Sequence, residues 1–144
     1  MSFDAAEFNT LALWLVEQRS DESSLRTSIS RTYYAGHLLA VKKLMEQRRW
    51  EPKGTGDDHQ AVIRELNRGR TTVLSQHLGH LLRLRQHADY HVDASESIGN
   101  QHCSFCKKVR ESSTSGTAQT NVTLAHWQDA KEVSGKCLPL IAKL

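Results

Sequence analysis

Residues 20–49 read SDESSLRTSISRTYYAGHLLAVKKLMEQRR, and this stretch decides the fold class because it continues without a proline. Apolar and small side chains recur along it at spacings of three and four residues, in two rows, as in a helix that is buried on two faces. The first row is Leu25, Ile29, Tyr33, Gly36, Ala40 and Leu44, and the second is Tyr34, Leu38, Val41 and Met45. Such a helix lies at the centre of a bundle, so the stretch predicts an all-α fold.

Helical patterns also occur on both sides of this stretch. We expect four further helices, over residues 4–19, 57–68, 71–94 and 122–143. Residues 95–121 are rich in Ser, Thr, Gly, Asn and Gln and predict a long polar loop. The 144 residues therefore predict one domain, an up-and-down bundle of four long helices and one short helix.

Composition excludes several classes of protein. With 38% hydrophobic and 24% charged residues, the chain is neither disordered nor membrane-embedded, and no apolar run is long enough to span a bilayer. The first residues, MSFDAAEF, are acidic where a signal peptide is basic, and three cysteines form an odd set. We therefore expect a cytoplasmic protein with reduced thiols and no membrane partner.

The charge is unevenly distributed along the chain. Residues 1–24 contain one Arg against five acidic residues, whereas residues 25–110 contain fifteen Lys and Arg against eight acidic residues. A basic segment can serve solubility alone, but it also permits a polyanionic partner such as RNA.

The expected fourth helix carries an anomaly at Arg85. Its core-facing row is Leu74, Leu78, Leu81, Arg85, Ala88 and Val92. Arg85 therefore stands where the row requires an apolar residue, and Asp89 lies one turn further on. A buried charge needs a partner. Either Arg85 and Asp89 neutralise each other at the edge of the core, or they face a second copy of the chain, and we expect a homodimer through this helix.

A second row on the same helix contains four histidines. It consists of His77, His80, Leu84, His87 and His91. Such a row can be a solvated face or supply a general acid or base, and His87 with His91 could bind a metal ion. Because no carboxylate-rich helix is evident to complete such a site, we expect no metal there.

The cysteines offer a second possible metal site. Cys103 and Cys106 form a C-x2-C motif, which lacks half of a tetrahedral site unless His102 and Cys137 complete it. We expect a reduced pair without metal, and a small zinc-stabilised adaptor is the alternative.

Three motifs resemble one known family. Residues 25–37, LRTSISRTYYAGH, resemble the LR-x-x-x-SR-x-YYA second helix of the HEPN domain family, and residues 81–91, LLRLRQHADYH, resemble its L-x-x-LR-x-x-ADY segment. His59 resembles the family's His before its short third helix. The resemblance covers most of residues 20–95 and implies a small helical bundle of the kind found in prokaryotic toxins and defence proteins.

The resemblance also implies an activity. Many members of the family are metal-independent endoribonucleases that use an Arg followed, after four to six residues, by a His. Carried onto this chain, the catalytic pair is Arg85 and His91, with Asp89 orienting a catalytic side chain and Tyr90 stacking on a base or binding phosphate. The expected further RNA contacts are Arg31, Gln86 and His87.

We therefore predict a metal-independent endoribonuclease of the toxin or antiviral type that needs no cofactor. The alternative is a catalytically silent HEPN module that dimerises and binds nucleic acid, a nucleotide or a nucleotidyltransferase. A cognate antitoxin or a nucleotidyltransferase is the expected protein partner.

The spacing of Arg85 and His91 places a condition on this site. On a continuous helix, residues six apart point about 120° away from each other. Either the helix ends or distorts near Tyr90, or the motifs of two copies meet across a dimer, as the resemblance implies.

Overall fold

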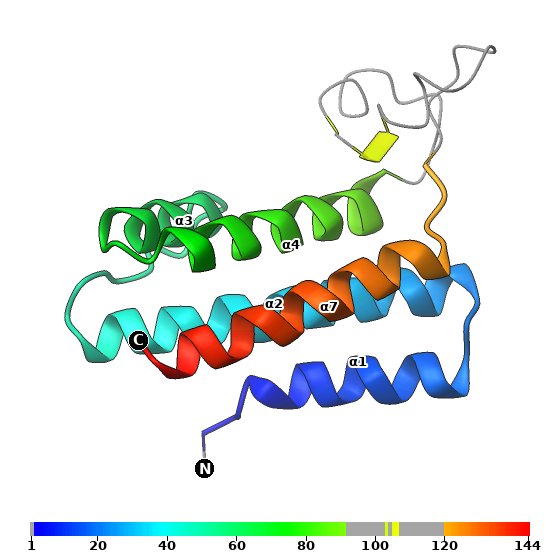
Figure 1. Cartoon of the computed structure of the whole chain (residues 1–144), viewed down its shortest axis with the longest axis horizontal. Helices are drawn as coiled ribbons and strands as arrows, with labels where there is room; N and C mark the ends of the chain where they lie inside the picture. The colour runs from blue at the N-terminus through cyan, green and yellow to red at the C-terminus, as the bar shows by residue number, and fades with distance from the viewer. Residues whose placement is uncertain (1, 92–102, 104, 107–119) are drawn as a thin grey trace.

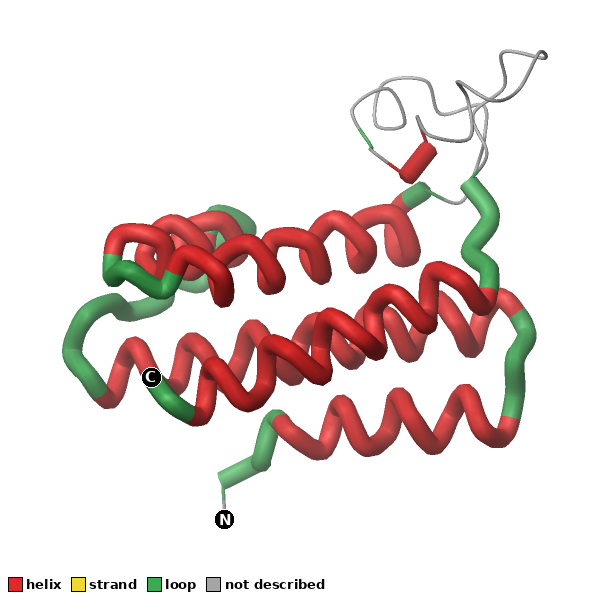
Figure 2. The backbone as a smooth tube through the Cα atoms, in the orientation of Figure 1, coloured by secondary structure: helices red, strands yellow, loops and turns green. Residues whose placement is uncertain are grey.

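The computed structural model describes residues 2–91, 103, 105–106 and 120–144. These residues form helices and connecting segments and contain no strand (Figures 1 and 2). The five helices are α1 (Ala6–Gln18), α2 (Glu22–Glu46), α3 (Asp58–Arg68), α4 (Thr72–Tyr90) and α7 (Leu124–Ala142). The predicted all-α bundle of long helices plus a short one is confirmed, and most of the loop predicted at 95–121 lies outside the described residues.

Helix α2 is the central helix of the bundle. It contacts each of the other four helices, and the first of its two predicted rows is buried along its whole length. Gly36 lies in this row, where an added Cβ would come within 3.4 Å of Leu78 and 4.0 Å of Ile141. The absence of a side chain at Gly36 therefore lets α4 and α7 approach α2 closely.

The second predicted row of α2 is less buried than expected. Leu38 and Met45 are exposed, whereas Ser28, Thr32 and Ala35 are fully buried. Small and weakly polar side chains line the second buried face because they let a neighbouring helix come close. A pattern based on large apolar residues does not detect such a face.

The expected end of α4 at about residue 94 is wrong, because the helix ends at Tyr90 with His91 as its C-cap. The guanidinium of Arg26 donates through Nη1 to the carbonyls of His87, Ala88 and His91, at 3.3, 2.8 and 3.3 Å. Carbonyls in the last turn of a helix have no partner within the helix. Arg26, which lies on α2, supplies one and thereby stabilises the helix end.

The C-terminal end of α4, the N-terminal end of α7 and the turn between α1 and α2 lie at the same end of the bundle (Figure 1). Cys103 and the pair Phe105–Cys106, drawn in yellow, lie next to this end of α4. Within the described part of the chain, no helix has both the length and the apolar character needed to cross a bilayer.

Candidate functional site

Arg85 is held among tyrosines and a carboxylate within its own chain. Its side chain is 10% exposed, and Nε donates to Asp89 Oδ2 at 2.8 Å. Nη2 donates to the hydroxyls of Tyr34, at 2.9 Å, and Tyr90, at 3.0 Å. The charge that breaks the apolar row is therefore paired inside the chain. We call these residues, Arg85, Asp89, Tyr34 and Tyr90, the Arg85 centre.

The Arg85 centre retains positive charge and hydrogen-bonding capacity. Among the described residues, Nη1 of Arg85 has no hydrogen-bond partner, so it can donate to an incoming oxygen. A second guanidinium, that of Arg31, lies 5.7 Å from the centroid of the Tyr34 ring, and Arg85 lies 5.1 Å from the same centroid. Two cations therefore lie against one ring with Asp89 as the counter-charge, which favours an anion.

His59 and Tyr33 form a hydrogen-bonded pair beside the Arg85 centre. The Tyr33 hydroxyl lies 2.7 Å from His59 Nδ1, and the His59 ring lies 5.9 Å from the Tyr34 ring. Burial and the neighbouring Arg85 guanidinium lower the pKa of His59. Burial raises the pKa of Tyr33. The imidazole and the phenol are therefore both neutral at pH 7.

His37 packs against the Tyr33–His59 pair and stacks on the Tyr33 ring. Its ring lies 4.5 Å from the His59 ring, and its Nδ1 is buried without a hydrogen-bond partner among the described residues. Burial, reinforced by His59, lowers the pKa of His37 to about 4. From the sequence, His37 is recognisable only as a histidine six residues after Arg31.

The two predicted catalytic residues have different surroundings. The contacts of Arg85 are those of the Arg85 centre, whereas Nδ1 of His91 lies 3.7 Å from Cys106 Sγ. His87, a predicted RNA contact, is 1% exposed and faces the same sulfur. Gln86, another predicted RNA contact, is half-buried on α4 between Arg85 and His87. The structure thus brings Arg85, Asp89 and Tyr90 together, with Arg31 nearby, and places His87 and His91 in a separate group.

This second group, the Cys–His cluster, consists of His87, His91, Cys103 and Cys106. One potential ligand atom from each residue lies within 4.8 Å of the others, an arrangement that could hold a metal ion. Of the residues considered from sequence to complete a site, Cys137 lies on α7 in the main core. His102 lies outside the described residues.

The cysteines and His87 are buried. Burial, reinforced by Cys103, raises the pKa of Cys106 to about 12, and burial lowers the pKa of His87 to about 4. In the absence of an ion Cys106 and His87 are therefore neutral at pH 7.

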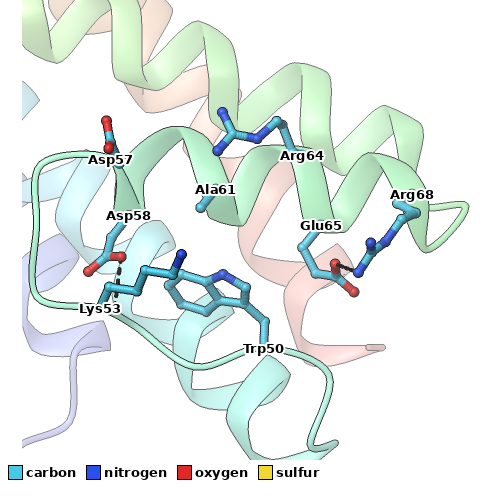
Figure 3. Close-up of a pocket in the computed structure, with 8 residues that line it drawn as sticks. All are labelled: Trp50, Lys53, Asp57, Asp58, Ala61, Arg64, Glu65 and Arg68. Atoms are coloured by element: carbon cyan, nitrogen blue, oxygen red, sulfur yellow. Dashed lines mark hydrogen bonds and ion pairs between the residues drawn. The ribbon is translucent and has the colours of Figure 1, made fainter.

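A pocket of about 530 Å³ lies between α3 and the segment that precedes it (Figure 3). Trp50 and Lys53 face α3 across it, and Asp58 accepts hydrogen bonds from the backbone N–H groups of Lys53 and Gly54 at 2.9 and 2.8 Å. Its charged lining is three cations and three carboxylates: Lys53, Arg64, Arg68, Asp57, Asp58 and Glu65. The balance gives the pocket no preference for a polyanion, and we assign it no ligand.

Comparisons with known proteins identify no relative. No protein-family profile matches the chain, and no curated protein or solved structure matches it significantly. The HEPN resemblance stays a prediction from sequence motifs. Function must therefore be inferred from the Arg85 centre and the Cys–His cluster.

Proposed function

We propose that this chain is a metal-independent endoribonuclease in which Arg85 stabilises the charged transition state and His59 transfers the proton. The observation that supports this assignment is that Arg85 and His59 lie against the same ring, that of Tyr34, at 5.1 and 5.9 Å. The Arg85 guanidinium, which has an unused donor, and the neutral His59 imidazole therefore border the same ring, and burial together with the nearby guanidinium lowers the pKa of His59.

The chemistry requires a base for the ribose 2′-hydroxyl and positive charge on the phosphorane. In the tautomer in which His59 donates its Nδ1 proton to the Tyr33 oxygen, Nε2 carries the lone pair and acts as the base. Arg85 Nη1 donates to a phosphate oxygen. The 2′-oxygen then attacks phosphorus and the bond to the 5′-oxygen breaks. The leaving 5′-oxygen takes a proton from water and His59 returns its proton to solvent, which leaves a 2′,3′-cyclic phosphate and a 5′-hydroxyl.

His59 takes the role that the sequence motif gives to His91. Nδ1 of His91 lies 3.7 Å from the Cys106 sulfur, whereas the hydrogen bonds of Arg85 go to Asp89, Tyr34 and Tyr90. His59, by contrast, has a lowered pKa that suits a base at neutral pH.

The surface around the Arg85 centre also offers contacts for binding RNA. Tyr90 is 55% exposed, and its ring centroid lies 5.0 Å from the Arg85 guanidinium, so it can stack on a base at the edge of the centre. Arg31 adds a second cation for the phosphate backbone. The toxin or antiviral role and the protein partners that the resemblance implies belong to this proposal.

The test is cleavage of a labelled single-stranded RNA without added divalent ions. Wild type should leave 2′,3′-cyclic phosphate ends. The variant Arg85→Lys should be slower by about 10²-fold, because an ammonium cannot replace the guanidinium fork. His59→Gln should also be slower, by 10²-fold or more, as is typical for loss of a general base.

Two histidine variants serve as comparisons for His59→Gln. His77→Gln changes a half-buried histidine of α4 away from the site and should cleave at the wild-type rate. His91→Gln distinguishes the geometry from the motif, and we expect it to retain cleavage wherever it stays folded. A folded His91→Gln that is inactive, together with an active His59→Gln, would overturn the assignment of the base.

A second candidate function is the catalytically silent module. The observation that favours it is that Arg85 is almost buried and already bonded to Asp89, Tyr34 and Tyr90, as a structural arginine would be. This reading predicts RNA or nucleotide binding without cleavage by the wild type.

The silent module also predicts a homodimer, which analytical ultracentrifugation at micromolar concentration would detect. The Arg85–Asp89 pair is not evidence for a second copy of the chain, because the two charges are paired within one chain. A monomer that binds no RNA would exclude this candidate.

A further inference from the structure

We propose that the Cys–His cluster is a structural zinc site in which His87, His91, Cys103 and Cys106 are the four ligands. The ligand atoms of these four residues lie within 4.8 Å of one another. Four protein ligands leave no open position, which is typical of structural rather than catalytic zinc sites. The inference is independent of RNA cleavage.

Three of the separations between the ligand atoms match the edges of a tetrahedral zinc site. His87 Nδ1 lies 3.3 Å from Cys106 Sγ and 3.6 Å from Cys103 Sγ, and His91 Nδ1 lies 3.7 Å from Cys106 Sγ. Zinc bonds of about 2.3 Å to sulfur and about 2.0 Å to nitrogen give tetrahedral S···N edges of about 3.5 Å. These three edges therefore need little change to hold the ion, and the whole set of ligand atoms lies within 4.8 Å of one another.

The orientation of His87 also fits a metal ligand. Its Nε2 lies 3.4 Å from the carbonyl oxygen of Asn121, to which an Nε2–H can donate. This hydrogen bond leaves the lone pair on Nδ1, the atom that faces the two sulfurs. Metal-binding histidines commonly donate their second ring N–H to a carbonyl in this way.

The sequence pattern supports the same site. His87-x3-His91 and Cys103-x2-Cys106 are separated by eleven residues. The spacing within each pair is that of a Cys2His2 zinc finger in reversed order, and the linker is about one residue shorter than the usual twelve to fifteen. The histidine pair ends α4, and the cysteine pair approaches the same helix end from further along the chain.

The charge balance of the cluster favours a divalent ion, and the type of its ligand atoms favours zinc. Two thiolates and two neutral imidazoles around a divalent cation form a site with no net charge, which suits its burial. The two thiol protons leave to solvent when the ion binds. A tetrahedral set of two sulfurs and two nitrogens selects zinc, whereas magnesium and calcium prefer oxygen ligands.

The test measures metal content. Wild-type protein, saturated with Zn²⁺ under reducing conditions and dialysed into metal-free buffer, should hold about one zinc per chain by mass spectrometry of the elements. Cys106→Ala and His91→Ala should retain less than about a tenth of that amount. Matched controls are Cys137→Ala, which changes another fully buried thiol, and His77→Ala, and both should keep the ion.

A second measurement covers variants that fail to fold. Wild type loaded with Co²⁺ in place of Zn²⁺ should show a thiolate-to-cobalt charge-transfer band and the intense visible bands of tetrahedral cobalt. A wild type without bound zinc, a cobalt spectrum without thiolate bands, or full retention of zinc by folded Cys106→Ala would each overturn the proposal. Each of these results would instead indicate a buried thiol pair that hydrogen-bonds to His87.

Discussion

At the scale of single residues, Arg85 shows how a break in a pattern can locate a site. The apolar row of α4 identifies Arg85 as a buried charge that needs a partner, and the structure provides Asp89 at 2.8 Å. The sequence could not identify Tyr34 as a partner, because its hydroxyl comes from α2, fifty-one residues away along the chain. It could not place His59 at the same ring either, since His59 lies on α3.

The first prediction concerns the Arg85–Asp89 pair. Arg85→Met should lower the free energy of unfolding by about 2 kcal/mol, because Asp89 is left partly buried without its cation. The double variant Arg85→Met/Asp89→Leu should recover at least half of this loss, since no lone charge remains. Urea denaturation measures both. A single variant as stable as wild type would mean that the guanidinium serves function alone.

The second prediction concerns His37, whose pKa in the fold is about 4 against 6.5 for a free histidine. The unfolded chain binds a proton more readily, so His37 makes the protein less stable as the pH falls from about 6.5 to 4. At pH 5 this contribution is about 2 kcal/mol. Arg85 and His59 disfavour the protonated form, and Asp58 partly offsets them.

His37→Leu tests this prediction. Between pH 7 and pH 5 the variant should lose less stability than wild type, by about 2 kcal/mol in urea denaturation. Other histidines titrate in both proteins, so the comparison isolates His37. Equal losses in the two proteins would show that His37 is not held neutral.

At the scale of helices, boundaries set by local chemistry were predictable and those set by tertiary contacts were not. The start of α2 is of the first kind, because its N-cap is Asp21, a residue type that favours this position, and Asp21 accepts hydrogen bonds from Ser24. The end of α4 does not follow from sequence, because Arg26 on another helix binds the last carbonyls. The Cys–His cluster was missed for a similar reason, since each motif is incomplete by itself.

The third prediction concerns Arg26. Arg26→Ala should lower the free energy of unfolding by about 2 kcal/mol, because its guanidinium donates to carbonyls of α4 and to Thr120. Faster hydrogen exchange at the C-terminal turn of α4 should accompany this loss. Arg31→Ala is the matched control. It removes an arginine of the same helix that, within the described part of the chain, contacts the rings of Phe8 and Tyr34, and it should cost less than about 1 kcal/mol. Similar losses in both variants would contradict the capping role.

At the scale of the whole molecule, the bundle was predictable because α2 alone indicates a central position. Its first buried row consists of apolar and small residues. Segments in which apolar residues repeat every 3.6 positions precede and follow α2. How the ends of these helices meet was not predictable, because no local pattern relates the end of α4 to Cys103. The Cys–His cluster lies at this end of the bundle (Figure 1).

The fourth prediction is that removal of zinc destabilises the entire protein. An ion present at a thousand times its dissociation constant adds about 4 kcal/mol to the stability of the folded state. For a chain of this size a strong chelator should therefore lower Tm by about 10 °C. Cys106→Ala should not respond to the chelator. A wild type with an unchanged Tm would show that the cluster contributes no binding energy to folding.

The position of α7 has a consequence for synthesis of the protein. This last helix packs against both α2 and α4 and brings Trp127, Val133 and Ile141 into the core. Until it emerges from the ribosome, the apolar faces of α2 and α4 that it covers remain open to water. The nascent chain therefore carries an incomplete core until α7 has been synthesised, and chaperones bind exposed apolar surfaces of this kind. A polypeptide that stops before residue 124 lacks α7 and leaves these faces of α2 and α4 uncovered.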